Sequence, residues 1–357
     1  MTPTAITRRV IAPLSLYDKV GRRLVRRTHA SGAVAAQRAR FYRTAWADAA
    51  ASVGAAVEDL GDGLLDMRHG DMLLRVRENL TSLDDPVTMA VAGDKPLVYH
   101  LLAARGLPVA RHIVCRYDDL EAASMFAAGV GVPCVVKPAL DSAAGAGVTT
   151  CVVGEAHLAR AMARAGAWSN DVVVEEQAAG DNYRLLYLDG ELLDAVLRGP
   201  PRVRGDGRSS IAQLVAADNA DRARRGIDAA QSLLRVDHDL RNTLRSQGFS
   251  LRSVPAAGNW VQIKTVVNDN RREDNEAATA RLCGSLVEAC AAAAAAVGAR
   301  LAGVDVITRD PGVPLAEAGG VVLEVNTTPG HYYHYLRRGE GAPVAMMILQ
   351  RLVRGGS

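Results

Sequence analysis

The stretch that decides the fold is Leu323-Glu324-Val325-Asn326-Thr327-Thr328-Pro329-Gly330, near the end of a chain of 357 residues. Its first half alternates apolar and polar residues, so Glu324 and Asn326 share one face of a predicted strand. Asp305 lies on the preceding predicted strand, 301–308, within reach if the two strands pair in simple register. Two carboxylates and an amide oxygen are hard ligands that suit Mg²⁺. The alternative is a surface hairpin with solvated acids, but unpaired charge in an otherwise apolar strand is costly.

Lysine is rare in this chain, and its few positions are informative. Of the 42 basic residues, four are lysines: Lys19, Lys95, Lys137 and Lys264. A lysine that persists where arginine is the usual cation indicates a need for a compact, flexible point charge. Chance survival explains Lys19 well enough, whereas we expect Lys95 and Lys137 to be functional.

Lys137 ends an apolar predicted strand, 134–137, and a loop with Gly145 and Gly147 follows it. Glycines let backbone N–H groups approach phosphate oxygens, with the lysine close by. The loop does not have the Walker spacing, so it is no ordinary P-loop. A second extended stretch, 172–178, offers backbone groups to an adenine edge, although alone it is only a strand with an acidic end.

The remaining pattern predicts alternating helices and strands without internal repeats. We expect two βαβ-like passes over about 108–175 and a hairpin of 184–188 with 191–198, because Asp189-Gly190 favours a type I′ turn. The other expected elements are strands at 57–60, 64–67 and 72–76 and helices at 41–53, 96–105, 210–217, 227–247 and 275–297.

Composition sets limits on the partners. The formal charge of +3 is too small to favour nucleic acid, although residues 1–43 hold ten basic residues and one acid. A solvated helix face is the simplest explanation of that bias; an acidic substrate, an anionic surface or a subunit contact are the alternatives. Five cysteines without a CxxC pair suit a reducing compartment. With no bilayer-length apolar run and no signal-peptide pattern, we expect a cytoplasmic protein with no membrane partner.

Together and in this order, the motifs resemble those of the ATP-grasp superfamily. The markers are Asp94-Lys95, Val135-Val136-Lys137-Pro138, Val174-Glu175, Gly303-Val304-Asp305 and the stretch 323–330. Within the superfamily, the middle of the chain is most similar to the ATP-grasp module of cyanophycin synthetases. That similarity is carried by 183–186, 197–207, 211–219, 244–248, 253–258 and Asn268. The resemblance covers about residues 88–345.

This resemblance implies an α/β (α+β) chain with the ATP-grasp fold. A small N-terminal pre-ATP-grasp α/β domain is assigned by position to residues 1–90, and the ATP-grasp domain to 91–357. Within that domain we expect a mobile lid lobe over about 108–175 and a C-terminal antiparallel-sheet lobe over about 176–357.

The resemblance also implies a role for each candidate residue. Those that hold the nucleotide phosphates are Lys95, Lys137, Gly145 and Gly147. Those that line the adenine or lie near the ribose are Glu175, Glu176, Ala178, Asp181 and Asn182. Those that ligate two Mg²⁺ ions, with Mn²⁺ as a substitute, are Asp305, Glu324 and Asn326. Those that face the acyl phosphate or substrate carboxylates are Arg184, Arg198 and Lys264.

ATP-grasp ligases transfer the γ-phosphate of ATP to a carboxylate and let an amine attack the acyl phosphate. The resemblance therefore implies an ATP-dependent carboxylate–amine ligase that acts on amino acids or short peptides and releases ADP and phosphate. Arginines near the site favour an acidic donor, and a homodimer suits many ligases of this type. Two alternatives are a phosphotransferase acting on a hydroxyl and an inactive nucleotide-binding regulator. The intact metal-ligand set argues against the regulator.

Two features depart from the cyanophycin pattern. The loop 141–147 has fewer glycines and no arginine, which weakens the case for its phosphate contacts. The chain also stops at Ser357 without a Mur-ligase-like second catalytic domain, so we do not expect a cyanophycin synthetase. The segment His331-Tyr332-Tyr333-His334 shapes the substrate pocket or is an ordinary packed turn, and the sequence favours neither.

Overall fold

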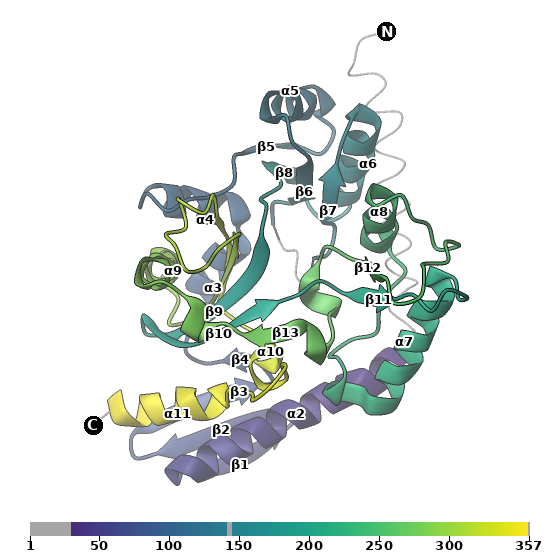
Figure 1. Ribbon diagram of the computed structural model, residues 1–357. Helices are drawn as coiled ribbons and strands as arrows, with labels where there is room; N and C mark the ends of the chain where they lie inside the picture. Colours follow the sequence, from purple (N-terminus) through teal and green to yellow (C-terminus); the bar gives the residue numbers. More distant parts are fainter. Residues whose placement is uncertain (1–29, 141–144, 356–357) are drawn as a thin grey trace.

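The computed structural model describes residues 30–140 and 145–355. Figure 1 shows a central sheet with a small α/β lobe at one end and two long helices over a second sheet at the other. Residues 1–29 and 141–144 lie outside the described residues. The first of these ranges holds most of the basic residues of the segment 1–43. No described helix has both the length and the apolar character needed to cross a membrane.

The central sheet has five strands in the order β13-β10-β9-β14-β15, and every neighbouring pair is antiparallel. Its strands are β9 (Asp181–Leu188), β10 (Glu191–Arg198), β13 (Asn275–Ala277), β14 (Leu301–Thr308) and β15 (Val321–Asn326). Both predicted hairpins are confirmed. Asp189 and Gly190 have φ angles of 50° and 81°, the positive values that a type I′ turn requires.

One face of this sheet packs on α9 (Gly284–Val297) and α4 (Lys95–Ala103). Alternate strand residues, such as Leu185 in β9 and Val304 in β14, point into this core. The many alanines of α9 let its backbone lie close to the sheet. The prediction of a helix over 275–297 is wrong in its first third. Asn275–Ala277 instead pairs with β10 and forms the edge strand β13. A 3₁₀ turn, η4 (Thr279–Arg281), separates this strand from α9.

The opposite face of the sheet is divided. Leu186, Leu188 and Leu301 pack against α2 (Ala30–Val53) and α11 (Val344–Gly355). The buried residues of α2 recur at helical spacing, namely Tyr42, Ala45, Trp46, Ala49 and Ala50. The other half of the face carries charged and amide side chains, and the short helix α10 (Tyr332–Tyr335) follows β15 there.

The N-terminal unit is α2 followed by a four-stranded antiparallel sheet. Its strands are β1 (Ala56–Gly61), β2 (Leu64–His69), β3 (Met72–Arg77) and β4 (Leu80–Thr81). The three predicted strands are thus confirmed. The helix α3 (Pro86–Gly93) was not predicted; Asp85 caps it by accepting hydrogen bonds from the N–H groups of Val87 and Thr88.

The lobe expected as the lid has its own core between one sheet and two helices. The elements are β5 (His112–Arg116), α5 (Leu120–Val130), β6 (Cys134–Pro138), β7 (Thr149–Val152), α6 (Glu155–Ala165) and β8 (Asp171–Glu176). Their order along the chain matches the prediction. Neighbouring strands in the order β5-β8-β6-β7 are antiparallel. The strands that each helix connects, β5 with β6 and β7 with β8, therefore run parallel with one strand between them, so the two predicted βαβ-like passes form as split βαβ units.

A smaller module lies between β10 and β13. It consists of β11 (Arg202–Arg204), α7 (Ile211–Arg225), η1 (Gly226–Asp228), α8 (His238–Ser246), β12 (Trp260–Gln262), η2 (Val267–Asp269) and η3 (Arg272–Asp274). The predicted helix 227–247 is confirmed over α8 and wrong before it, where only the short turn η1 is helical. Asn219 of α7 explains the interruption: its amide bonds both the N–H and the carbonyl of Leu234, which holds that backbone outside a helix.

Candidate active site

The polar half of the central sheet is organised around the Asp305 carboxylate. Asp305 pairs in register with Glu324 on β15 and with Arg184 on β9, so the three side chains share one face. Arg184 donates from Nε and Nη2 to the two Asp305 oxygens at 2.6 and 2.7 Å. Arg198 on β10 donates from Nη2 to Oδ2 at 2.6 Å. The structure thus brings two of the predicted catalytic arginines together with one predicted metal ligand.

These buried charges shift one another's pKa values. Burial alone would raise the pKa of Asp305, but the guanidinium groups of Arg184 and Arg198 hold it well below its usual range. The pKa of Arg198 is lowered by burial and by the neighbouring Arg184. Partial removal from water and the Asp305 charge raise the pKa of Glu324. The cluster is therefore a charged network whose members depend on one another.

Glu324 and Asn326 extend this network to the sheet's edge strand. The side-chain nitrogen of Asn326 donates to Glu324 Oε1 at 3.0 Å and to the Gly303 carbonyl at 3.3 Å. The side-chain oxygen of Asn326 takes no part in these two hydrogen bonds. Glu324 keeps 41% of its side chain accessible. Asp305, Glu324 and Asn326 thus lie on one face, and their oxygens are of the kind that Mg²⁺ prefers, while both Asp305 oxygens accept hydrogen bonds from the two arginines. Among the described residues, no group of three or more His, Cys, Asp and Glu side chains is placed to hold a metal ion.

Lys137 is held in a second buried cluster, between the lid-like lobe and the central sheet. Its Nζ lies 2.8 Å from Glu175 Oε1 and donates to the Tyr99 hydroxyl at 2.6 Å. That hydroxyl in turn donates to Glu175 Oε2 at 2.7 Å. Burial and the Glu175 carboxylate raise the pKa of Tyr99 well above its usual value, so the phenol stays protonated. All three side chains are buried.

Tyr99 also connects this cluster to the oxygen set. Its hydroxyl lies 3.3 Å from the carbonyl of Leu323, the residue before Glu324. Lys95 begins the same helix, α4, and its backbone N–H donates to the carbonyl of Ala139, just after β6. The backbones that carry both predicted phosphate lysines therefore adjoin, and one of these lysines lies next to the hairpin that carries the metal-ligand candidates.

Gly145 and Gly147 lie in a turn before β7 with φ angles of 74° and 78°. A Cβ atom at Gly147 would come within 2.7 Å of both Pro138 and Trp168. At Gly145 it would meet Val266 at 2.6 Å. Both positions require glycine for conformation and for space. Their predicted contact with phosphate remains a prediction.

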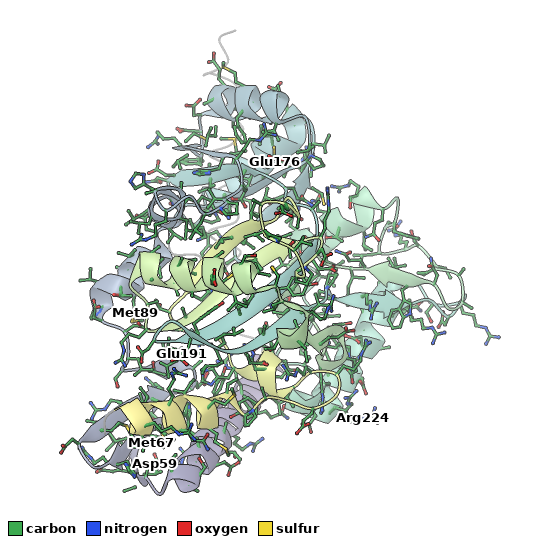
Figure 2. All side chains as sticks on the ribbon, turned by 60° about the vertical axis from the view of Figure 1, so that its left-hand side comes forward. Asp59, Met67, Met89, Glu176, Glu191 and Arg224 are labelled. Atoms are coloured by element: carbon green, nitrogen blue, oxygen red, sulfur yellow. The ribbon has the colours of Figure 1, made fainter. Side chains whose placement is uncertain are left out.

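The segment expected to line the adenine begins in the last two residues of β8 and continues after that strand. Glu176, labelled in Figure 2, forms an ion pair with Arg111 at 2.6 Å. Ala178 is partly buried and Asp181 is exposed. The Asn182 oxygen accepts from Arg198 Nε at 2.8 Å and Nη2 at 2.6 Å, so this residue anchors an arginine of the site. The predicted adenine and ribose roles remain predictions.

Lys264 lies in the small module, just after β12. Its Nζ donates to Asp237 at 2.7 Å and to Asp269 at 2.6 Å. Burial works against the ammonium, but these two carboxylates outweigh it and raise the pKa of Lys264. Nothing in these contacts joins Lys264 to Arg184 or Arg198, and its predicted catalytic role remains a prediction.

Two residues of the site were not predicted. Tyr99 belongs to no motif that the sequence analysis used. The one sequence signal for it is its position four residues after Lys95, in the predicted helix 96–105. Tyr333 was named only as one of a segment with two interpretations. Its ring lies over both arginines, 5.9 Å from the Arg184 guanidinium and 5.3 Å from that of Arg198. It therefore covers the charged network.

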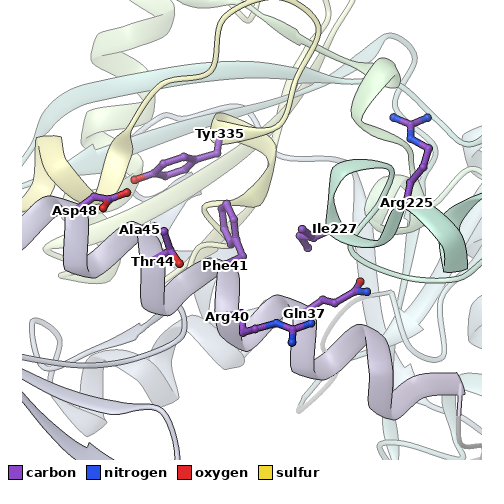
Figure 3. Close-up of a pocket in the computed structure, with 9 residues that line it drawn as sticks. All are labelled: Gln37, Arg40, Phe41, Thr44, Ala45, Asp48, Arg225, Ile227 and Tyr335. Carbon is purple, nitrogen blue, oxygen red and sulfur yellow. The ribbon is translucent and has the colours of Figure 1, made fainter.

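A surface hollow lies outside this site, between α2, η1 and α10. Figure 3 shows Phe41, Ile227 and Tyr335 around it, with Arg40 and Arg225 at its margin. None of the residues predicted to bind nucleotide or metal lines this hollow. The charged site above is thus the one that the sequence motifs form.

Known proteins are similar to this chain in sequence and in structure. The cyanophycin synthetase of Trichormus variabilis is 30% identical over 273 residues, which is 76% of this chain and 30% of that protein. The glutathione biosynthesis bifunctional protein GshAB of Streptococcus mutans is 29% identical over 303 residues, 82% of this chain and 40% of that protein. A crystal structure of a bifunctional glutathione synthetase from Pasteurella multocida superposes with a TM-score of 0.54 at 25% identity, covering 85% of this chain and 42% of that one.

The chain belongs to the ATP-grasp superfamily. Its central antiparallel sheet and separate α/β lobe are the ATP-grasp fold predicted from the motifs. ATP-grasp ligases in general use ATP and Mg²⁺. No protein-family model matches the chain. This ATP-grasp chain spans about a third of the length of the cyanophycin synthetases it matches.

Proposed function

We propose that this protein is an ATP-dependent ligase that joins a carboxylate to an amine through an acyl phosphate and releases ADP and phosphate. Amino acids or short peptides are the proposed substrates. Similarity to cyanophycin synthetases and to a glutathione biosynthesis protein supports this class of reaction. The phosphotransferase and regulator alternatives have no observation in their favour.

One observation carries the proposal: the Tyr99 hydroxyl lies 2.6 Å from Lys137 Nζ and 3.3 Å from the Leu323 carbonyl. Leu323 precedes Glu324, so the ammonium group lies close to the hairpin that holds the oxygen set. A nucleotide triphosphate needs both kinds of group around the transferring phosphate. We infer that the triphosphate binds between Lys137 and the face that carries Asp305 and Glu324.

The protein's own groups have distinct roles in this proposal. Lys137 and Lys95 bind phosphate oxygens, while Asp305, Glu324 and Asn326 hold two Mg²⁺ ions, for which Mn²⁺ is a substitute. Bound Mg²⁺ neutralises phosphate charge and orients the group that is transferred. Arg184 and Arg198 stabilise negative charge that develops on the acyl phosphate. No covalent enzyme nucleophile is needed.

Arg198 also supports an anionic donor. Its Nη1 atom is shielded from water and has no hydrogen-bond partner among the described residues. Leaving a buried donor unsatisfied costs about 1–3 kcal/mol. A carboxylate or acyl-phosphate oxygen that reached Nη1 would satisfy it. We therefore propose that the donor is an acidic amino acid or a peptide with an acidic side chain.

A hydroxylamine trap tests the reaction type. The protein is incubated with ATP, Mg²⁺, hydroxylamine and single amino acids or dipeptides. A ligase yields a hydroxamate together with ADP, whereas a phosphotransferase yields a phosphate ester and no hydroxamate. ADP release and product mass with pairs of amino acids then identify the acid and the amine. If no acid gives hydroxamate and no pair releases ADP, the proposal is wrong.

We propose in addition that the protein acts in the cytoplasm. All five cysteines are free thiols, which suits the reducing cytoplasm. We also propose a homodimer, which light scattering of the purified protein tests directly.

A further inference from the structure

Four separate elements meet at the hydroxyl of Tyr99. The residue lies on α4, accepts a hydrogen bond from Lys137 of β6 and donates to Glu175 of β8. Its weaker contact, at 3.3 Å, is with Leu323 of β15. The exposed fraction of Tyr99 is 1%, so water does not compete for these bonds. The hydroxyl thus touches both the lid-like lobe and the hairpin that carries the metal-ligand candidates.

The ring and the hydroxyl of Tyr99 serve different purposes. The ring packs with Ala139 and Val173 in a small core and lies 4.7 Å from the His112 ring. The hydroxyl is not needed for that packing. Nor is it needed to neutralise Lys137, because Glu175 already pairs with the ammonium at 2.8 Å. A role for the oxygen must therefore come from how it directs the charged groups.

An ammonium group has three N–H donors. In Lys137 one of them is directed to the Tyr99 oxygen and another to Glu175. These two fixed partners determine where the third N–H points. Without the hydroxyl, Lys137 is free to rotate about its ion pair with Glu175, and the direction of the remaining donor is lost.

We propose that Tyr99 is a positioning residue of this site, whose hydroxyl orients the Lys137 ammonium toward the nucleotide phosphates. It ties that orientation to β15 through the Leu323 carbonyl. The inference rests on the proposed function, since it assigns Lys137 to nucleotide binding. It concerns nucleotide affinity, however, so it can fail while the ligase reaction stands.

The test measures binding of the non-hydrolysable analogue AMPPNP with Mg²⁺ by calorimetry, independently of turnover. Tyr99→Phe removes the oxygen and keeps the ring. We expect affinity to fall about tenfold, the loss typical of one hydrogen bond to a charged group. In a Lys137→Met background the same change should alter affinity less than about twofold, because its effect passes through Lys137.

Tyr187→Phe is the matched control. Tyr187 is also fully buried and donates to a backbone carbonyl, that of Val287, but this bond ties it to α9 and not to Lys137 or Glu175. It should cost similar thermal stability and leave AMPPNP affinity unchanged. The proposal is overturned if Tyr99→Phe binds AMPPNP with wild-type affinity. It is also overturned if Tyr99→Phe lowers AMPPNP affinity by the same factor in the Lys137→Met background.

A second variant covers the case in which Tyr99→Phe does not fold. Placing 3-fluorotyrosine at position 99 keeps the ring and hydroxyl and makes the oxygen a weaker acceptor. We expect affinity to fall two- to threefold, and unchanged affinity would overturn the proposal. The proposed ligase function fails by a different result, namely normal AMPPNP binding with no hydroxamate and no ADP release.

Discussion

Replacing Lys137 by arginine keeps the charge and changes only its shape, which makes Lys137→Arg a sharp test of the site. The Nζ atom lies 2.6 Å from the Tyr99 oxygen, 2.8 Å from Glu175 and 5.0 Å from the Tyr99 ring centroid. Its side chain is 7% exposed, so there is no room to extend into water. A planar guanidinium placed here would form a forked pair with both Glu175 oxygens, and Tyr99 already donates to one of them.

The expected magnitude follows from these contacts. A guanidinium paired with Glu175 points its charge away from the nucleotide and loses a charge-assisted contact of about 1.5–3 kcal/mol. That loss lowers kcat/KM for ATP by about 10- to 150-fold. Overpacking costs a further 1–3 kcal/mol or so of stability, measured separately by urea unfolding. ADP release in a coupled assay at varied ATP gives the kinetic result. A folded variant with kcat/KM within threefold of wild type would refute the reasoning.

Three further predictions concern the oxygen set and the core. Glu324→Ala should abolish Mg²⁺-dependent ATP turnover by removing the most accessible carboxylate of the set; ADP release that still rises normally with added Mg²⁺ would contradict this. Asp305→Asn should lower the free energy of unfolding by about 3–5 kcal/mol, because Arg184 and Arg198 then stay buried without their counter-charge; an unchanged urea midpoint would contradict it. Burial between Tyr42 and Trp46 lowers the pKa of His331 to about 3, so stability should be full above about pH 6.5 and fall as the pH drops toward that value, by about 2 kcal/mol at pH 5. Between pH 7 and pH 5, the free energy of unfolding of His331→Phe should therefore fall by about 2 kcal/mol less than that of the wild-type protein. Equal losses in the variant and the wild type would show the prediction to be wrong.

Short-range signals were sufficient for the hairpins that build the site. The Asp189-Gly190 dipeptide fixes its own turn through positive φ angles, so β9 and β10 follow from local sequence. Glu324 and Asn326 alternate with apolar residues, and the two-residue period of a strand places them on one face whatever the rest of the fold does. The register that sets Asp305 opposite Glu324 depends on an irregularity between Asp305 and Val306, which leaves Leu323 as an extra residue in β15, and local sequence does not predict it.

Signals that depend on partners distant in the sequence were missed. The Ala-rich stretch after residue 275 favours a helix, yet its first three residues complete the edge of the sheet as β13. Helical periodicity around Leu234 is likewise overridden by hydrogen bonds to Asn219. Tyr99 belongs to the same class: its spacing identifies it as a core residue of α4, and only the fold shows that its hydroxyl reaches three other strands.

The charges on the two sides of the site explain why such a residue is useful. Lys137 and Glu175 balance each other on one side, and two guanidinium groups face the carboxylates of Asp305 and Glu324 on the other. A triphosphate that enters a balanced site gains most from a cation that still has a free donor. The Tyr99 hydroxyl is a neutral partner for both Lys137 and Glu175, so it directs the third Lys137 N–H without adding a charge to the pair. A phenol between a lysine and a carboxylate therefore lets a stable, buried ion pair also serve as a phosphate-binding group.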